Sequence, residues 1–145
     1  KLLEFYAVNL SDFFRQIEQK RVIIVKKADS KTLEFLDEKM KITLLASKLH
    51  NNSLESFIVK FDGEAHFATA VLPREVNGER IIYVIEGRIY ASLDKSESIT
   101  LETGDSVNYK SYVPCTINSV HDIRSSVFIS GMPPLIIPAD SQTHI

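Results

Sequence analysis

The chain has 145 residues, of which 25% are charged and 44% hydrophobic, and its formal net charge is −2. That length is enough for one domain with a real hydrophobic core, and the ordinary composition excludes collagen-like and wholly disordered proteins. The single cysteine excludes an intrachain disulfide, the near-neutral charge gives no field that would hold nucleic acid, and no apolar run is long enough to span a bilayer. We therefore expect one cytoplasmic domain without membrane contact.

The first twenty residues have a helical pattern. Apolar residues recur there at spacings of three and four with no Gly or Pro between them, and Asn9 and Ser11 are good N-cap types. We predict two short helices, over residues 1–7 and 12–19. Because the chain begins at Lys1 rather than Met, we expect it to be an excised piece of a longer protein.

From residue 21 onward the pattern changes to short strands. Runs of β-branched and aromatic residues are separated by Gly, Asn and Asp turn signals, with no helical segment between them. The predicted strands are 22–25, 42–47, 54–61, 65–72, 80–85, 88–93, 98–101, 106–109, 113–120 and 126–130. The Lys-rich stretch 31–41 is predicted to be a solvated surface, and the three prolines in 132–138 indicate an extended strap. This pattern is typical of an antiparallel sandwich or barrel.

Motifs for catalysis or metal binding are missing. The four histidines, His50, His66, His121 and His144, do not occur at the i, i+2 or i, i+4 spacings that bring imidazoles onto one ion. The chain has neither a Gly-x-Ser-x-Gly nor a Ser-x-x-Lys motif, and its five glycines never cluster into a phosphate loop. The residues alone therefore do not argue for an enzyme.

Two segments resemble the motifs of the cupin family. Residues 79–87, Glu-Arg-Ile-Ile-Tyr-Val-Ile-Glu-Gly, look like the first cupin motif, and residues 101–115, which contain Gly-Asp and end in Val-Pro-Cys, look like the second. The second motif and the closing Ser-Gly-Met-Pro-Pro at 130–134 are similar to cupin sensor domains of helix-turn-helix regulators of the xenobiotic-response-element type. Residues 2–14 resemble the last helix of that DNA-binding domain and the segment leaving it.

The resemblance implies a fold, a domain division and a function. The fold is all-β, the double-stranded β-helix or jelly-roll barrel of cupins, preceded by the two short helices. Residues 1–20 are then a helical remnant and linker from an upstream helix-turn-helix domain, and residues 21–145 are the ligand-sensing domain. The function is effector sensing and dimerisation in a transcription regulator that is not an enzyme. The resemblance further implies that the chain forms a homodimer and that DNA is bound by the missing upstream domain rather than by this fragment.

The cupin metal positions are altered in this sequence. Metal-binding cupins hold their ion through two His and one Glu of the first motif and one His of the second. Aligned on the Glu-Gly turn, this chain has Arg74, Val76 and Arg80 at the first three positions and Cys115 at the fourth. One soft ligand beside two cations is a poor metal site, so we expect no metal and no other cofactor.

Arg80 motivates a hypothesis for the ligand. An arginine that points into a barrel is an uncompensated buried charge unless an acid meets it, and a small effector with a carboxylate or phosphate fits that need. The alternative is that Arg80 forms a salt bridge with Glu86 or Glu102, or that its side chain extends to the mouth of the barrel. The residues expected to bind the effector are Arg74, Arg80, Ile82, Tyr83, Tyr109 and Cys115.

Two other functions remain open at this stage. A small cupin enzyme of the isomerase kind needs an acid and a base, for which His66, Tyr83 and Tyr109 are the candidates. A purely structural dimerisation module would have a filled barrel. Cys115 also has two interpretations, as a small buried hydrophobe or as a redox-sensing thiol.

Overall fold

The computed structural model describes residues 22–45, 54–69 and 72–134. The helices predicted over residues 1–7 and 12–19 lie outside these ranges, and so does the expected linker at 1–20. Within the described ranges the one helical element is a short 3-10 turn, η1 (Lys27–Asp29), and no helix there is long and apolar enough to cross a membrane.

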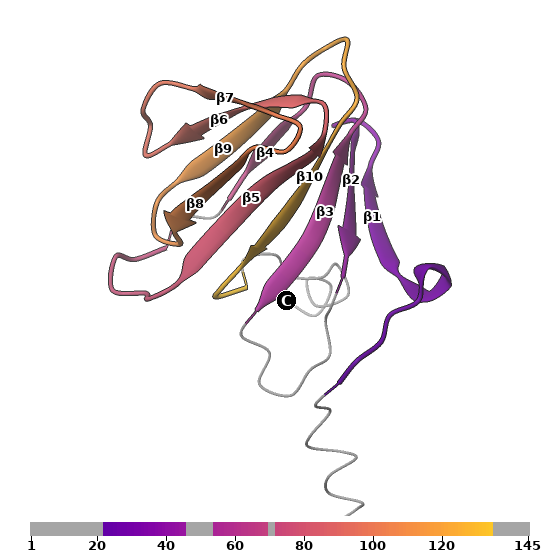
Figure 1. Cartoon of the computed structure of the whole chain (residues 1–145), viewed down its shortest axis with the longest axis horizontal. Coiled ribbons are helices and arrows are strands. Elements are labelled where there is room, and N and C mark those ends of the chain that lie inside the picture. The colour runs from indigo at the N-terminus through magenta and orange to yellow at the C-terminus, as the bar shows by residue number, and fades with distance from the viewer. Residues whose placement is uncertain (1–21, 46–53, 70–71, 135–145) are drawn as a thin grey trace, which may run out of the picture.

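The larger sheet has six antiparallel strands in the order β1-β2-β3-β10-β5-β8 (Figure 1). Its strands are β1 (Lys31–Phe35), β2 (Met40–Leu44), β3 (Glu55–Phe61), β10 (Ser125–Gly131), β5 (Glu79–Glu86) and β8 (Ser106–Lys110). The last strand of the described residues, β10, therefore lies in the middle of the sheet, paired on one side with β3 and on the other with β5.

The smaller sheet has four antiparallel strands in the order β4-β9-β6-β7. Its strands are β4 (His66–Ala68), β9 (Cys115–Ser119), β6 (Arg88–Leu93) and β7 (Ile99–Glu102). Gly87 makes the tight turn from β5 into β6, where φ is +87°, and the chain thereby passes from one sheet to the other.

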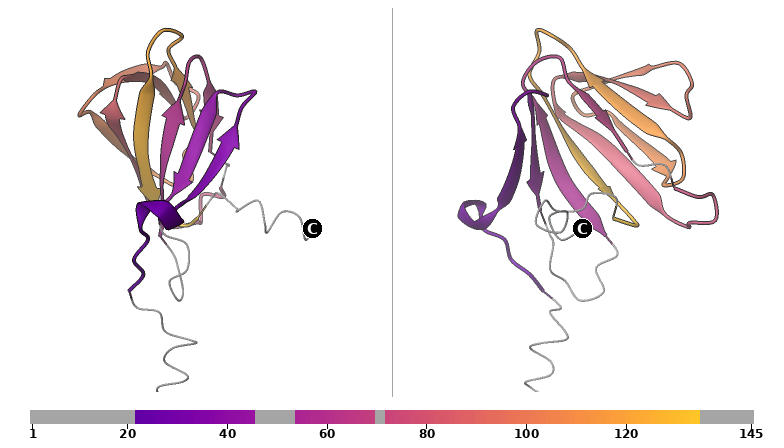
Figure 2. Two further views of the ribbon diagram at one scale, coloured as in Figure 1. Left: turned by 90° about the vertical axis from the view of Figure 1, so that its right-hand side faces the viewer. Right: turned by 180° about the vertical axis from the view of Figure 1, so that it is seen from behind.

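The two sheets face each other, and the hairpin of β1 and β2 extends one edge of the larger sheet (Figure 2). Strands β3-β10-β5-β8 opposite β4-β9-β6-β7 form the eight-stranded arrangement of a jelly roll. The prediction of an all-β antiparallel fold is confirmed.

The hydrophobic core lies between the sheets. Alternate residues of each strand point inward, and the burial pattern of β3, with every second side chain buried, is typical. The buried apolar side chains are Met40, Ile42, Phe57, Val59, Phe61, Ala65, Phe67, Ile82, Val84, Ile89, Ala91, Leu101, Cys115, Ile117, Val127 and Ile129. This core holds the two inner faces in the register that positions the polar residues between them.

Two sequence predictions about strands are wrong. Residues 22–25 form no strand, and Val22 and Ile24 are 78% and 76% exposed, because a β-branched run has no neighbouring strand to pair with there. The stretch 31–41 is largely exposed, as expected, but it also contains β1 and the start of β2, which the sequence pattern did not predict. The paired acids Asp37 and Glu38 do lie in the exposed turn between them.

Candidate functional site

One cross-strand row on the inner face of the larger sheet is polar. The register places Glu55 of β3 opposite Gly131 of β10, Gly131 opposite Arg80 of β5, and Arg80 opposite Tyr109 of β8. Apolar residues occupy the next inner row, which runs from Phe57 through Ile129 and Ile82 to Val107. We call the row of Glu55, Gly131, Arg80 and Tyr109 the polar row.

Arg80 is held by partners from this chain. Its Nη1 donates to Oε1 of Glu55 at 2.9 Å, and its Nη2 donates to the carbonyl of Pro133 at 2.6 Å. Both side chains of the ion pair are buried, at 1% exposure for Arg80 and 7% for Glu55. A salt bridge was one of the expectations for Arg80, but the acid is Glu55 and not Glu86 or Glu102, as predicted. Glu102 accepts instead from Arg88 at 2.9 Å.

Gly131 makes the ion pair sterically possible. A Cβ at this position would lie 2.8 Å from Cγ of Arg80 and 2.7 Å from the carbonyl oxygen of Glu79. The bare backbone of Gly131 therefore leaves the space through which the Arg80 side chain passes toward Glu55 on the next strand but one.

Two buried polar atoms of the polar row have no hydrogen-bond partner among the described residues. They are Nε of Arg80 and the hydroxyl of Tyr109. Leaving such a group unsatisfied costs about 1–3 kcal/mol, so native proteins keep few of them. Burial and the neighbouring Cys115 raise the pKa of Tyr109 well above its ordinary value, and burial likewise raises the pKa of the Cys115 thiol. Both groups are thus neutral hydrogen-bonding groups at physiological pH.

The structure brings together four of the six residues expected to bind a ligand. Arg80, Ile82 and Tyr109 point inward from the larger sheet, and Cys115 points inward from β9 of the smaller sheet. Cys115 is 1% exposed, and its electrostatic influence reaches Tyr109.

The other two expected residues lie elsewhere. Tyr83 is 41% exposed on the outer face, because it alternates with the inward-pointing Ile82 and Val84. Arg74 is exposed in the segment before β5, where its guanidinium lies 5.6 Å from the centroid of the Tyr112 ring. Neither side chain shares the interior with Arg80.

The residues named for an isomerase do not converge. His66 is exposed on β4, and its Nδ1 lies 2.7 Å from the side-chain oxygen of Asn118. Tyr83 is on the outer face of the other sheet, and Tyr109 alone of the three points into the interior.

The interior does not fit the metal of metal-binding cupins. Of the four aligned positions, Arg80 is a cation already paired with Glu55, Arg74 is exposed, Val76 offers no ligand, and the raised pKa of Cys115 disfavours the thiolate that a metal needs. Over residues 22–45, 54–69 and 72–134, no three His, Cys, Asp or Glu side chains gather in a metal-binding group.

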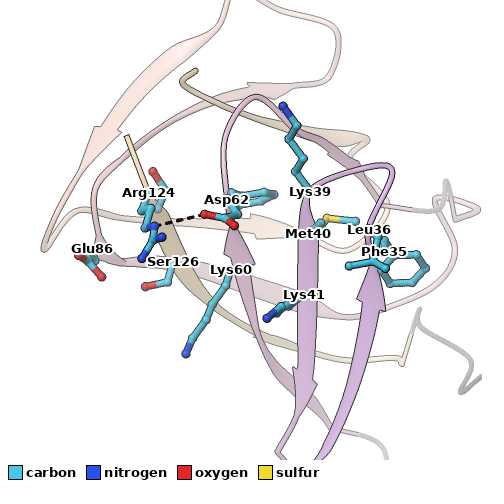
Figure 3. A pocket seen from close by; sticks show the side chains of 12 residues that line it. Phe35, Leu36, Lys39, Met40, Lys41, Lys60, Asp62, Glu86, Arg124 and Ser126 are labelled. Carbon is cyan, nitrogen blue, oxygen red and sulfur yellow. Dashed lines mark ion pairs between the residues drawn. The ribbon is translucent and has the colours of Figure 1, made fainter. Parts of the chain in front are cut away.

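Two surface depressions are lined by described residues. The larger, about 430 Å³, lies where β2, β3, β5 and β10 meet the turn after β1, and it includes the ion pair of Arg124 with Asp62 (Figure 3). The smaller, about 230 Å³, is lined by residues that include Arg74 and Tyr112. Neither depression is lined by any residue of the polar row.

Comparison with known proteins identifies the fold. No protein-family model matches the chain, and no curated protein matches it in sequence. KdgF from Halomonas sp. superposes with a TM-score of 0.62 at 18% identity, covering 83% of this chain and 98% of that one. A predicted oxalate decarboxylase from Thermotoga maritima has a TM-score of 0.61 at 12% identity, covering 77% and 100%. The cupin domain of an XRE-family transcriptional regulator from Enterobacter cloacae has a TM-score of 0.57 at 17% identity, covering 66% and 98%.

These likenesses show that the chain has the cupin fold, as the sequence motifs implied. Identities of 12–18% show the fold alone. The same architecture is found in a regulator domain and in a protein described as an oxalate decarboxylase, so the function has to be argued from the interior of this barrel.

Proposed function

We propose that this chain is the effector-binding and dimerising domain of a cytoplasmic transcription regulator, in which an upstream helix-turn-helix domain reads DNA. The resemblance of residues 79–87 and 101–115 to regulator cupins motivates the class. The likeness in fold to the regulator domain from Enterobacter cloacae is consistent with it.

The unsatisfied pair of Arg80 Nε and the Tyr109 hydroxyl is the observation that carries the proposal. Both atoms belong to directly paired residues of one inner row, Arg80 of β5 and Tyr109 of β8, which is why we assign them to one ligand. A ligand atom that accepts hydrogen bonds from both groups removes the free-energy cost of leaving them unsatisfied. This gain contributes to the affinity of the ligand.

The ion pair narrows the chemistry of this effector. Glu55 already neutralises Arg80, so an additional buried anion would itself be the uncompensated charge. This pairing removes the electrostatic reason for a carboxylate or phosphate. It favours a neutral molecule with a carbonyl oxygen, which accepts from Arg80 Nε and from the Tyr109 hydroxyl, and with an apolar part that contacts Ile82 and Cys115.

The regulatory step is a shift between two arrangements of the dimer. An effector biases that equilibrium only by the difference in its affinity for the two arrangements. Arg80 connects β5 to β3 through Glu55 and to the segment after β10 through Pro133, so a ligand on Arg80 acts on three parts of the barrel at once. Binding rather than catalysis is further supported by the separation of His66, Tyr83 and Tyr109.

A thermal-shift screen with Tyr109→Phe as the matched variant tests the proposal. The probes are small amides and ketones, and each is compared with a carboxylate of similar size. We expect neutral carbonyl compounds to raise the melting temperature, because a ligand at one hundred times its Kd stabilises by about 2.7 kcal/mol. In Tyr109→Phe, at least ten times more ligand should be needed to produce the same shift in melting temperature. The unliganded variant should stay folded, because it loses only an unsatisfied hydroxyl.

Tyr90→Phe is the control, because Tyr90 lies on β6 and points away from the interior. It should leave every ligand-induced shift unchanged. The proposal is wrong if no compound of the panel stabilises the protein, or if Tyr109→Phe responds to the ligands as the unaltered chain does.

A further inference from the structure

The outer faces of the two sheets differ in character. On the smaller sheet the outward residues are mostly polar, for example Asn118, Arg88 and Glu102. On the larger sheet an apolar group occupies the middle of the outer face, and it consists of Ile58, Ile81, Tyr83, Ile85 and Phe128. Tyr83 and Ile85 are each 41% exposed.

The register arranges this outer face symmetrically about β10. In one row Phe128 of β10 lies between Ile58 of β3 and Tyr83 of β5. In a neighbouring row Ser126 lies between Lys60 and Glu86. The apolar row thus has an aromatic residue at its centre.

The charged row has opposite charges on its two sides, as Figure 3 shows for Lys60, Ser126 and Glu86. No ion pair of Lys60 or Glu86 occurs with any residue in the described part of the chain. Lys60 also lies directly opposite Lys41, a repulsive arrangement of like charges on paired strands.

From this arrangement we infer that the outer face of the larger sheet binds a second copy of the chain, with a two-fold axis parallel to β10. Rotation about such an axis places β10 of one copy against β10 of the other, and β3 of one copy against β5 of the other. Phe128 then contacts Phe128 of the second copy, Ile58 faces Tyr83, and Lys60 faces Glu86, twice per dimer. Face-to-face packing of two sheets with nearly aligned strands, about 10 Å apart, is a common arrangement.

An axis across the strands would be worse matched. With Phe128 again at the centre, Lys60 would face Ser56 and Glu86 would face Ile81, because these residues flank Ser130 in the row on the other side. That arrangement leaves four charges per dimer without a partner. Complementary charge therefore favours the axis along β10.

This inference rests on the dimerising part of the proposed function, and it adds the surface on which dimers form. Ligand binding is measured separately by thermal shift, so failure of one part is distinguishable from failure of the other.

The test is charge reversal on one chain, read by sedimentation velocity over a range of concentrations. K60E and E86K each place like charges in contact twice per dimer, and we expect each to raise the dimer Kd about tenfold or more. The double variant K60E/E86K restores opposite charges across the axis and should return the Kd to near its original value. F128K places two cations at the axis and should give monomers.

Y90K is the matched control, because Tyr90 is an outward aromatic residue of the smaller sheet, and it should leave the Kd unchanged. Circular dichroism confirms that each variant is folded. The inference is overturned if the chain dimerises and the single reversals leave the Kd unchanged, or if the double variant is as weak as the singles. A chain that stays monomeric at every concentration also overturns it, and a loss of thermal stability in F128K would then show that another segment of the same chain covers this face.

Discussion

Arg80 and Glu55 form an ion pair that is stabilising only while both members are present. Each charge has been removed from water, and the Coulomb attraction between them offsets that desolvation. Glu55 lies 25 residues before Arg80, and the two meet only because Gly131 separates their strands without a side chain.

Removing one member of this pair should be far more costly than removing both. Glu55→Gln leaves the Arg80 charge buried without a counter-charge, and we expect a loss of about 3–5 kcal/mol in the free energy of unfolding. The double variant Glu55→Leu/Arg80→Met should be more stable than either single change. Urea denaturation measures each free energy.

Glu102→Gln serves as the comparison, because Glu102 pairs with Arg88 at the surface, where solvent screens the charges. Its effect should be small. If Glu55→Gln is no more costly than Glu102→Gln, the buried pair contributes nothing special to the fold.

The inward direction of Arg80, Ile82 and Tyr109 follows from strand alternation, which the sequence shows. The same alternation excludes Tyr83 from the interior, since a residue directly after an inward-pointing one points outward. Glu55 was also within reach of such reasoning, because it alternates with Phe57, Val59 and Phe61. The contact of Glu55 with Arg80 could not be predicted in this way, because the placement of β3 and β5 on either side of β10 depends on the topology of the whole sheet.

At the scale of the elements, the β1–β2 hairpin shows where strand prediction fails. The pattern of β1 alternates Leu33 and Phe35 with polar residues, but six of the eleven residues in 31–41 are charged and mask the signal. An edge strand tolerates those charges, which also discourage pairing with other chains. Runs flanked by a glycine turn, such as β5 and β6, were predicted to within one residue at each end.

Lys39 carries a conformational cost at the turn of this hairpin. Its φ is +52°, in the left-handed region, and its carbonyl accepts from the amide of Asp62 at 2.9 Å. Lys39→Gly should raise the free energy of unfolding by about 0.5–1 kcal/mol, because glycine adopts this φ without steric strain.

Lys39→Ala is the matched comparison, since it removes the charge and keeps the strained φ. Urea denaturation should rank Lys39→Gly above both the unaltered chain and Lys39→Ala. A glycine variant less stable than Lys39→Ala would contradict this account of the turn.

At the scale of the whole molecule, stability should decline in mildly alkaline solution. Burial raises the pKa of the Cys115 thiol, so the thiol stays protonated in the folded chain while the unfolded chain releases that proton at about pH 8.5. The folded state then binds more protons than the unfolded state. The free energy of unfolding is therefore intact below pH 8 and falls as pH rises from there toward the raised pKa.

Urea denaturation between pH 7.5 and 9.5 measures this decline, and Cys115→Ala should flatten it even though the smaller side chain lowers stability at every pH. An equal decline in Cys115→Ala would assign the pH dependence to other groups.

The central position of β10 has a consequence for how the chain becomes folded. Both neighbours of β10 precede it by far in the sequence, with Phe61 pairing to Ser125 and Arg80 to Gly131. During synthesis, the edges of β3 and β5 that pair with β10 therefore stay open until residues 125–131 have left the ribosome. Such long-range closure makes assembly slow and leaves the half-made sheet open to wrong pairing. The chain thus acquires its barrel, its ion pair and its outer apolar face together, in one late event.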